Sequence, residues 1–382
     1  MTAHSTAVKP DSNWRLNTPW RRMIAVNLLV MGALFIYKVL DSYPGDQYTQ
    51  LLATYHFGFI KRALIGTIVS VGFPILPSWS PYLVGGMIWL VTAGLFVTMF
   101  KRTVGFANEN LPLFIFTFGS PFFLKNFIQN LGYYDIYGCA FAALLLTIPA
   151  RSTWYVVLAF LGCFVLILIH HIHMLMYVPT ICLIVVLRHY VYCSLTAWMI
   201  VFAIAALGIL SAEFLVAQFY GTVRVPLAEF IAYLHSRMTD ENAIISPSIF
   251  YRTLAQETEG TRVLLSSNLA RIPVYGILIA VHAPLISYFI NLVRALAFDL
   301  HRKILFAGIA AITTAYLVIF SIAFDYARWI SGWATCMILI VFAVRSLPTS
   351  SKISPIPQDD RLALRLGWIL TLVPRVGTTK PF

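Results

Sequence analysis

The chain has 382 residues, of which 59% are hydrophobic and only 11% are charged, and its mean hydropathy is +0.80. Soluble globular domains carry about 25% charged residues, so the composition excludes an ordinary soluble protein and indicates an all-α, polytopic integral membrane protein. The net charge of +12 is scattered between apolar runs, which argues against nucleic acid as a partner and favours contact with membrane lipids.

The first 22 residues, MTAHSTAVKPDSNWRLNTPWRR, are polar and basic. The apolar run that follows at 23–40 has no small-x-small cleavage site before the sequence DSYPGD. We therefore expect a cytoplasmic N-terminal tail at 1–22 that leads into a retained signal anchor rather than a removed signal peptide.

Successive apolar runs predict about ten transmembrane helices in a single domain at 23–345. The stretch 153–187 is too long for one crossing, because at about 1.5 Å per residue it would measure about 52 Å against a hydrocarbon core of about 30 Å. The polar place for a break is HHIHM at 170–174. The predicted spans are residues 23–40, 82–100, 111–125, 134–150, 153–170, 172–187, 194–216, 272–293, 304–324 and 329–345.

Basic residues concentrate on alternate connections, including both terminal tails. The opposite short connections carry only Lys61, Arg62, Lys125 and Arg328. The positive-inside rule then predicts that both termini are cytoplasmic. The longer loops on the other side, residues 41–81 and 217–271, are expected to be external.

Two segments have the pattern of helices that lie in the membrane interface. Residues 47–76 mix apolar and polar positions around Lys61 and Arg62, which predicts an amphipathic helix on the outer surface, followed by a re-entrant turn that ends at Pro74 and Pro77. The sequence RLALRLGWILTLV at 361–373 is too short to span. We expect it to lie on the inner surface, within a cytoplasmic tail at 346–382.

The informative polar side chains fall on the predicted outer side. Asp41 and Asp46 follow the first span and flank a Pro-Gly turn, whereas mid-membrane positions carry almost no charge, with Glu213 as the nearest exception. Because an ion-coupled transporter needs ionisable groups near the midplane, this pattern favours chemistry on a lipid-linked substrate whose polar head lies at the interface. The rest of this outer set is Lys61, Arg62, Asp135, His170, His171, His173, Asp325 and Arg328.

The acidic members of the set also fit structural roles. Asp41, Asp46 and Asp135 each stand where an aspartate could cap the N-terminus of a helix. Asp325 and Arg328 have the i,i+3 spacing of a salt bridge at the start of a helix. These alternatives stay open at the level of the sequence.

The basic and imidazole side chains have structural alternatives as well. Lys61 and Arg62 fit a contact with lipid headgroups. His170 and His171 are neighbours that would point apart on a helix, which disfavours a metal site built from all three histidines and favours turn positions or one histidine on a phosphate. No disulfide is expected, because all five cysteines lie in or beside apolar runs: Cys139, Cys163, Cys182, Cys193 and Cys336.

Four short strings stand out against this layout: GFIKRALIGT at 58–67, GYYDIYG at 132–138, HHIHMLMYVP at 170–179 and FDYARW at 324–329. With a carboxylate just after the first span, many short spans and a large late external loop, the chain resembles the C-type (GT-C) membrane glycosyltransferases. Its strings are similar to those of bacterial EpsG-like exopolysaccharide-biosynthesis membrane proteins. It departs from larger members in lacking a soluble C-terminal domain and an Asp-x-Asp pair.

The resemblance implies a GT-C-like fold in the bacterial inner (cytoplasmic) membrane. It implies transfer of a sugar from a polyprenyl-phosphate-linked donor to a glycan or lipid acceptor on the extracytoplasmic face, in cell-envelope or exopolysaccharide assembly. Inverting transfer needs a carboxylate base and cations beside the departing phosphate. Asp46 is preferred to Asp41 as the base because it adjoins the predicted amphipathic helix. The candidates for binding substrate or phosphate are Arg328, Asp325, Lys61, Arg62, His170, His171, His173 and Asp135.

Other functions stay open. A polysaccharide polymerase or ligase would join lipid-linked glycans and would need external cations, for which Arg224, Arg237, Arg252 and Arg262 are available. A lipid-linked substrate transporter or flippase, a non-catalytic subunit and an outer-face acyltransferase are further alternatives. No cofactor is firmly indicated, and a divalent metal stays open. So do other envelope-biosynthesis proteins as partners.

Overall fold

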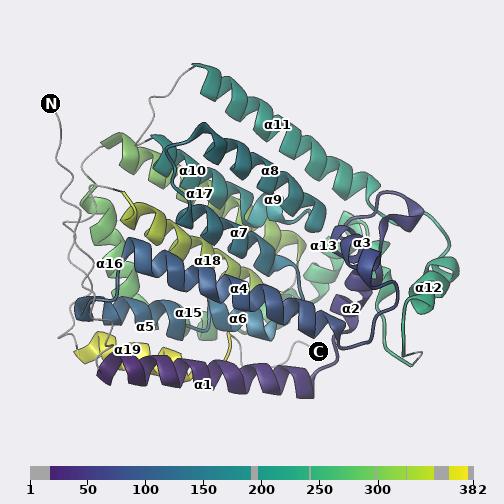
Figure 1. Cartoon of the computed structure of the whole chain (residues 1–382), viewed down its shortest axis with the longest axis horizontal. Helices are drawn as coiled ribbons and strands as arrows, with labels where there is room; N and C mark the ends of the chain where they lie inside the picture. Colours follow the sequence, from purple (N-terminus) through teal and green to yellow (C-terminus); the bar gives the residue numbers. More distant parts are fainter. Residues whose placement is uncertain are drawn as a thin grey trace.

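The protein is described by a computed structural model, which covers residues 18–190, 197–240, 242–296, 299–323, 325–347 and 361–376. The structure is 78% helical, and none of these ranges contains a β-strand. The long helices run side by side along one direction, and several short helices gather at one end of the bundle (Figure 1). The expected all-α class is confirmed.

Six helical segments are long and apolar enough to cross a membrane. A seventh is counted if α15 (Ile272–Val281) and α16 (Ala283–Arg294), which meet at an angle of 61°, form one span. The chain is therefore a multi-pass membrane protein. The six segments are α1 (Thr18–Asp41), α4 (Ser80–Thr103), residues 108–129, α11 (Ala197–Tyr220), α17 (Asp299–Ile322) and α18 (Tyr326–Arg345).

Three more apolar helices, α7 (Asp135–Thr147), α8 (Thr153–Ile169) and α10 (Val178–Tyr190), have 13, 17 and 13 residues. They occupy three of the expected spans but are short for a full crossing, so the count of ten stays a prediction. Burial separates the segments further. The apolar window of residues 108–129 is 100% buried, whereas that of α11 is 6% buried, which places the former inside the bundle and most of α11 against lipid.

The break predicted in 153–187 is confirmed. α8 ends at Ile169, His170 has an extended backbone with φ −156° and ψ 106°, and the single turn α9 (His173–Met176) precedes α10. Two other expected spans are also interrupted. The run 111–125 divides into α5 (Leu111–Gly119), which follows the turn η2 (Asn108–Asn110), and α6 (Leu124–Gln129). The run 272–293 bends at His282.

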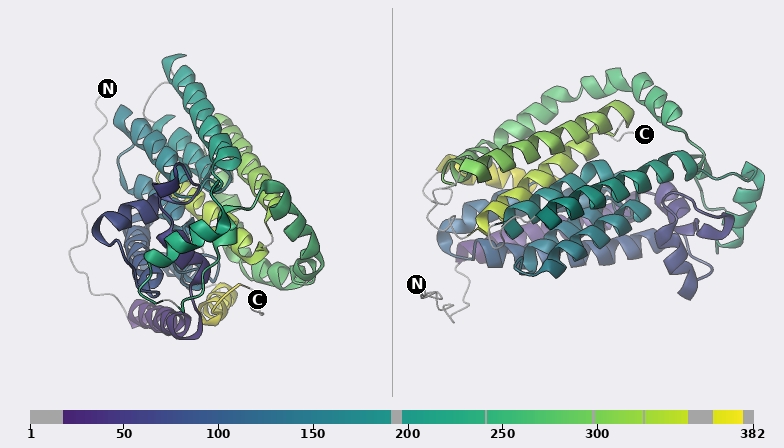
Figure 2. Two further views of the ribbon diagram at one scale, coloured as in Figure 1. Left: turned by 90° about the vertical axis from the view of Figure 1, so that its right-hand side faces the viewer. Right: turned by 90° about the horizontal axis from the view of Figure 1, so that it is seen from above.

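A second, smaller core lies at one end of the bundle and is here called the end cap (Figure 2). It contains the buried side chains of Tyr48, Leu52, Phe230 and Phe250. Its elements are α2 (Gly45–Leu52), η1 (Tyr55–Phe57), α3 (Leu64–Gly72), α12 (Leu227–Ser236) and η3 (Pro247–Phe250), after which α13 (Leu254–Val263) and α14 (Leu265–Leu269) follow.

The end cap differs from the single amphipathic helix expected over 47–76. The chain instead folds back on itself, because Gly66 of α3 lies against the backbone that follows α2. A Cβ atom at Gly66 would stand 2.0 Å from the carbonyl oxygen of Ala53. Arg237 joins the two halves of the cap by donating to the carbonyl oxygens of Leu52 and, at 3.1 Å, of Pro74.

The C-terminal helix α19 (Arg361–Leu372) also lies elsewhere than expected. It does not lie flat on the inner surface but runs beside α1 and α5 in the bundle (Figure 1). Ala363, Gly367 and Leu370 form its buried face. The length rule correctly excluded a full crossing, but the small residues on one face allow a short helix to enter the bundle.

The contact at Gly66 yields a first test. Gly66→Ala should lower the thermal unfolding midpoint of the detergent-solubilised protein strongly or prevent folding, since its Cβ would meet backbone that cannot move aside. Gly72→Ala is the matched control in the same helix, because no atom lies within 4 Å of its added Cβ. Equal midpoints for the two variants, measured by size-exclusion after heating, would contradict the fold of the end cap.

Candidate functional site

A cavity of about 1590 Å³ lies between the end cap and the bundle. Seven of the ten base and substrate-binding candidates predicted from the sequence line it, and they come from five separate parts of the chain. Lys61, Asp135 and His173 do not line it and lie behind its wall. The seven are Asp41, Asp46, Arg62, His170, His171, Asp325 and Arg328.

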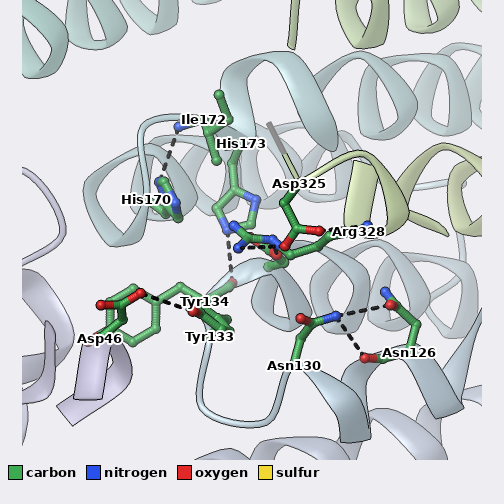
Figure 3. Close-up of polar contacts among 11 residues, drawn as sticks. Asp46, Asn126, Asn130, Tyr133, Tyr134, His170, Ile172, His173, Asp325 and Arg328 are labelled. Atoms are coloured by element: carbon green, nitrogen blue, oxygen red, sulfur yellow. Dashed lines mark hydrogen bonds and ion pairs between the residues drawn. The ribbon is translucent and has the colours of Figure 1, made fainter. Parts of the chain in front are cut away.

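Arg328 is the centre of the ionic contacts at this cavity (Figure 3). Its Nε lies 2.5 Å from Oδ2 of Asp135, and its Nη2 donates to Oδ1 of the same carboxylate at 3.4 Å. Its Nη1 lies 3.8 Å from Asp325. The guanidinium also lies over the rings of Tyr133 and Trp329, 4.7 and 4.3 Å from their centroids. Two carboxylates and two aromatic rings therefore fix this side chain.

Asp325 caps a helix, whereas Asp135 does not. Asp325 is the N-cap of α18 and accepts from the backbone N–H of Arg328 at 3.4 Å, as the spacing allowed. Asp135 opens α7 without acting as its N-cap, which is Tyr134. The shorter ion pair of Arg328 is with Asp135, 193 residues away, and not with its neighbour Asp325.

Asp46 is in the first turn of α2, whose N-cap is Pro44 with no side-chain hydrogen bond, so Asp46 is not the cap that the sequence also allowed. Its Oδ2 accepts a hydrogen bond from the hydroxyl of Tyr133 at 3.3 Å. Burial, with the nearby charge of Asp46, raises the pKa of Tyr133 above its ordinary value although Arg328 opposes the shift. Tyr133 is therefore a donor at neutral pH. Asp41, the last residue of α1, lines the cavity and is exposed.

The string GYYD places these groups through one tight turn. Gly132 has φ +89°, a conformation that favours glycine. A Cβ there would stand 3.2 Å from Cβ of Gln47, and a Cβ at Gly85 of α4 would stand 2.5 Å from the nitrogen of Gly132. The turn is held this closely between α2 and α4, so Tyr133 reaches Asp46 and Asp135 reaches Arg328.

Lys61 and Arg62 lie in the turn between η1 and α3, not on a helix. Lys61 is buried, and its Nζ donates to the carbonyl oxygen of Arg252 at 3.0 Å. This contact with the backbone is structural, and a contact of Lys61 with a phosphate stays a prediction. Arg62 lines the cavity and has φ +68°, the single positive value for a non-glycine residue in the described ranges. Its buried Nε has no hydrogen-bond partner there.

The three histidines divide between two roles. His173 does not line the cavity, and its Nε2 lies 3.1 Å from the carbonyl oxygen of Tyr134. His170 and His171 are in the turn before α9 and line the cavity, with ring centroids 5.3 Å apart. Burial, followed by the charge of Arg62, holds the pKa of both well below the ordinary value. Both rings are therefore neutral and act as hydrogen-bonding groups rather than as cations.

Within the described ranges, no three His, Cys, Asp or Glu side chains lie together in a group that could hold a metal ion. The four cysteines described, Cys139, Cys163, Cys182 and Cys336, are free. Cys193 lies outside the described residues.

The cavity lining includes residues that the sequence analysis did not single out, and Tyr133, Arg271 and Arg375 are the ones that bear on the chemistry. Tyr133 is inside a string that was singled out, but its role depends on a partner 87 residues away. Arg271 and Arg375 also line the cavity, and neither stood out, the latter because it was assigned to a cytoplasmic tail. Of the four loop arginines considered for a polymerase, only Arg252 lines the cavity within the described ranges.

Comparisons of the chain with protein-family models, with curated proteins and with solved structures find no match. The resemblance to membrane glycosyltransferases and the activity that it implies therefore stay proposals, argued from the geometry of the cavity.

The ion pair between Asp135 and Arg328 predicts that substitutions of the two residues have non-additive effects on the free energy of unfolding. Arg328→Gln should cost about 3 kcal/mol or more, because it leaves the buried carboxylate of Asp135 without its ion pair. Asp135→Asn should cost less, because Arg328 keeps its contact with Asp325 at 3.8 Å. The double variant should lose less than the sum, by about 1–3 kcal/mol. The exposed pair Glu259 and Arg262, at 3.2 Å with side chains 60% and 79% exposed, is the matched control and should show almost no coupling. Additive losses at the buried pair would contradict the contact.

Lys61 predicts a pH dependence of stability. Burial lowers the pKa of Lys61 from 10.5 to about 8, so between these values the unfolded chain binds a proton that the folded chain does not. Stability should therefore rise with pH across this window. Thermal midpoints measured from pH 7 to 10 should show this rise in the parent and its reduction in Lys61→Met, with exposed Lys101→Met as control. A difference between parent and Lys61→Met that stays constant with pH would count against a buried Lys61.

Proposed function

We propose that the chain is a membrane glycosyltransferase that moves a sugar from a polyprenyl-phosphate-linked donor to a glycan or lipid acceptor. The observation that carries this proposal is the mixed lining of one cavity. Its polar part holds Asp46, Arg62 and Arg328, while apolar side chains of the membrane helices line another part. Phe214, Leu215 and Phe219 of α11, with Val318 and Ile322 of α17, form this apolar wall.

Such a lining suits a substrate with a charged head and a hydrocarbon tail. The tail would lie along α11 and α17, in contact with lipid, while the sugar and phosphate reach the polar part. The volume of about 1590 Å³ exceeds the range of about 300–1,000 Å³ that is usual for small-molecule pockets. Donor head and acceptor can therefore occupy it together.

In the proposed reaction, Asp46 is the general base. Tyr133 holds its Oδ2 and so orients Oδ1 toward the acceptor hydroxyl, whose proton it takes. The acceptor oxygen forms a bond to the anomeric carbon as the bond from that carbon to the phosphate oxygen breaks. The phosphate leaves with the bonding electron pair. Asp41 is the other carboxylate candidate on the same wall.

The departing phosphate needs a cation, and the contacts favour Arg62 over Arg328. Arg328 is already compensated by Asp135 and Asp325, whereas the Nε of Arg62 is buried without a hydrogen-bond partner in the described ranges. The positive φ of Arg62 also favours a functional role, because strained backbone conformations are costly and cluster at functional sites. Arg328 then fixes the shape of the site.

The place of the end cap supports the proposed topology. Asp46 and Asp325, which the predicted topology places on the same side of the membrane, line one cavity. The C-terminal tail departs from this pattern, because its Arg375 lines the same cavity. With both termini in the cytoplasm, the end cap and the cavity would face the extracytoplasmic side of a bacterial inner membrane. This arrangement agrees with the GT-C and EpsG-like resemblance.

The size of the cavity also favours one second candidate, a polymerase or ligase that joins lipid-linked glycans. Arg252 is the loop arginine that could reach a pyrophosphate, since Arg237 is engaged with backbone carbonyls and Arg262 with Glu259. Arg252→Gln should shorten the glycan chains if the chain polymerises. If it adds single sugars, the variant should change the amount of product but not its length.

The proposed base is tested by Asp46→Asn, which should abolish glycan product in membranes supplied with radiolabelled lipid-linked sugar, at unchanged protein level. Tyr133→Phe should retain activity reduced by about tenfold, because it loses only the orienting hydrogen bond. Asp240→Asn, an exposed carboxylate outside the cavity lining, is the control. Normal product from Asp46→Asn would refute the assignment. Addition of EDTA to the same assay tests dependence on a divalent metal.

A further inference from the structure

The C-terminal helix α19 forms part of the membrane bundle through a close contact with α5. A Cβ at Gly367 would stand 2.4 Å from Cγ2 of Ile115, and a Cβ at Gly119 would stand 2.3 Å from Oγ1 of Thr371. Both pairs step by four residues in the same sense, so the two helices run in the same direction. Ala363, Gly367 and Thr371 repeat at every fourth position of the buried face, which is the small-residue spacing of close helix pairs in membranes.

The outer face of α19 suits lipid rather than water. Leu362, Ile369 and Leu372 are 63%, 52% and 65% exposed. Its two arginines, Arg361 and Arg365, lie in the first half of the helix. The second half therefore carries apolar side chains toward the surroundings, as expected of a helix that enters the membrane and ends inside it.

A helix that ends inside a membrane leaves carbonyl oxygens that water cannot reach and that need another hydrogen-bond donor. Lys125 of α6 is this donor. Its side chain is fully buried. Its Nζ donates to the carbonyl oxygens of Gly119 at 2.7 Å, Leu370 at 3.2 Å, Thr371 at 2.5 Å and Val373 at 3.4 Å. The one ammonium group of Lys125 thus caps the C-terminal ends of both α5 and α19, where the helix dipoles favour a positive charge.

The chain continues from this contact to the cavity. Arg375 and Val376, which lie within four residues of the end of α19, are part of the cavity wall. Arg375 is the one arginine of the described C-terminal segment 361–376 that lines the cavity. We propose that α19 is a re-entrant half-helix latched by Lys125, and that it delivers Arg375 to the cavity as a ligand for the phosphate of the substrate. The latch stands on its contacts alone, whereas the role of Arg375 rests on the proposed function.

The latch is tested by a disulfide. The added Cβ at Gly367 lies 3.4 Å from Cβ of Ile115, close to the separation of about 3.5–4.5 Å found in disulfides. With the five native cysteines replaced by alanine and folding checked by size-exclusion, Ile115→Cys with Gly367→Cys should form the bond on mild oxidation, as identified by mass spectrometry of the linked peptides. Ile115→Cys with Ile369→Cys, which uses the exposed face of α19, should not.

Lys125→Met in the same background should lower the yield of the 115–367 bond. Absence of that bond in the folded protein, or an equal yield from the 115–369 pair, would overturn the docking of α19. An unchanged yield in folded Lys125→Met would overturn the latch.

The role of Arg375 is tested by binding of a polyprenyl monophosphate to the full-length protein in nanodiscs, against the matching polyprenol. Arg375→Gln should weaken binding of the monophosphate by about tenfold, as expected for one charged hydrogen bond, and leave binding of the alcohol unchanged. Arg365→Gln, an exposed arginine on the same segment, should bind as the parent does.

The outcomes separate the two proposals. If the parent binds the monophosphate more tightly than the alcohol and Arg375→Gln binds the monophosphate equally well, the assignment of Arg375 is wrong. A parent that binds alcohol and monophosphate equally would overturn the proposed function and the ligand role together, and the disulfide would still decide the latch independently.

Discussion

Buried carbonyl groups at interrupted helices constrain this structure more than any other feature. Inside a membrane, a carbonyl released by a helix break has no water to bind, and this bundle breaks its helices repeatedly. At these breaks stand buried cations and imidazoles. Lys125 donates to carbonyl oxygens at the ends of α5 and α19. His173 contacts the carbonyl oxygen of Tyr134 in the turn before α7, and Arg188 donates to the carbonyl oxygens of Leu145 and Ile148 at the end of α7.

This constraint separates structural polar residues from functional candidates. Lys61 and His173 carry the residue types of a phosphate site, yet each has a backbone carbonyl as its partner. Asp46, Arg62 and Arg328 remain on the cavity wall. Among these, Arg328 is held by carboxylates, and Arg62 has the strained backbone and the unpartnered Nε. Glu257, another residue of the cavity wall, acts on the charge of Arg62, but the Nε of Arg62 has no hydrogen-bond partner within the described residues and is a donor that a substrate anion can use.

The sequence predicted features that depend on length and local composition. The break at His170 followed from a run too long for the bilayer, and the convergence of Asp46, His170 and Arg328 on one cavity followed from a consistent topology. The sequence could not predict contacts between distant segments. Where the run 111–125 is interrupted, Lys125 donates hydrogen bonds to carbonyl oxygens of residues 370–373, which lie some 245 to 248 positions later. No periodicity within either segment reveals this contact.

The same limit explains the end cap and α19. The amphipathic pattern at 361–373 correctly predicted a helix with two faces, whereas that at 47–76 predicted one helix where the chain forms α2, η1 and α3. Neither pattern predicted what covers the apolar face. In both, a glycine allows another part of the chain to do so: Gly66 against Ala53 in the end cap, and Gly367 against Ile115 in the bundle. A glycine on an amphipathic face is thus a signal for close packing, which the interfacial interpretation overlooked.

Among the six candidate spans of the described residues, the least buried one, α11, bears on the proposal of a lipid substrate. α11 has 6% of its apolar window buried, yet Phe214, Leu215 and Phe219 near its end line the cavity. A wall formed by a helix with so few internal contacts stands between the cavity and the surrounding lipid. A substrate that arrives through the bilayer therefore needs to pass only this wall. A water-soluble substrate would gain nothing from apolar side chains there, because they offer it neither charge nor hydrogen bonds.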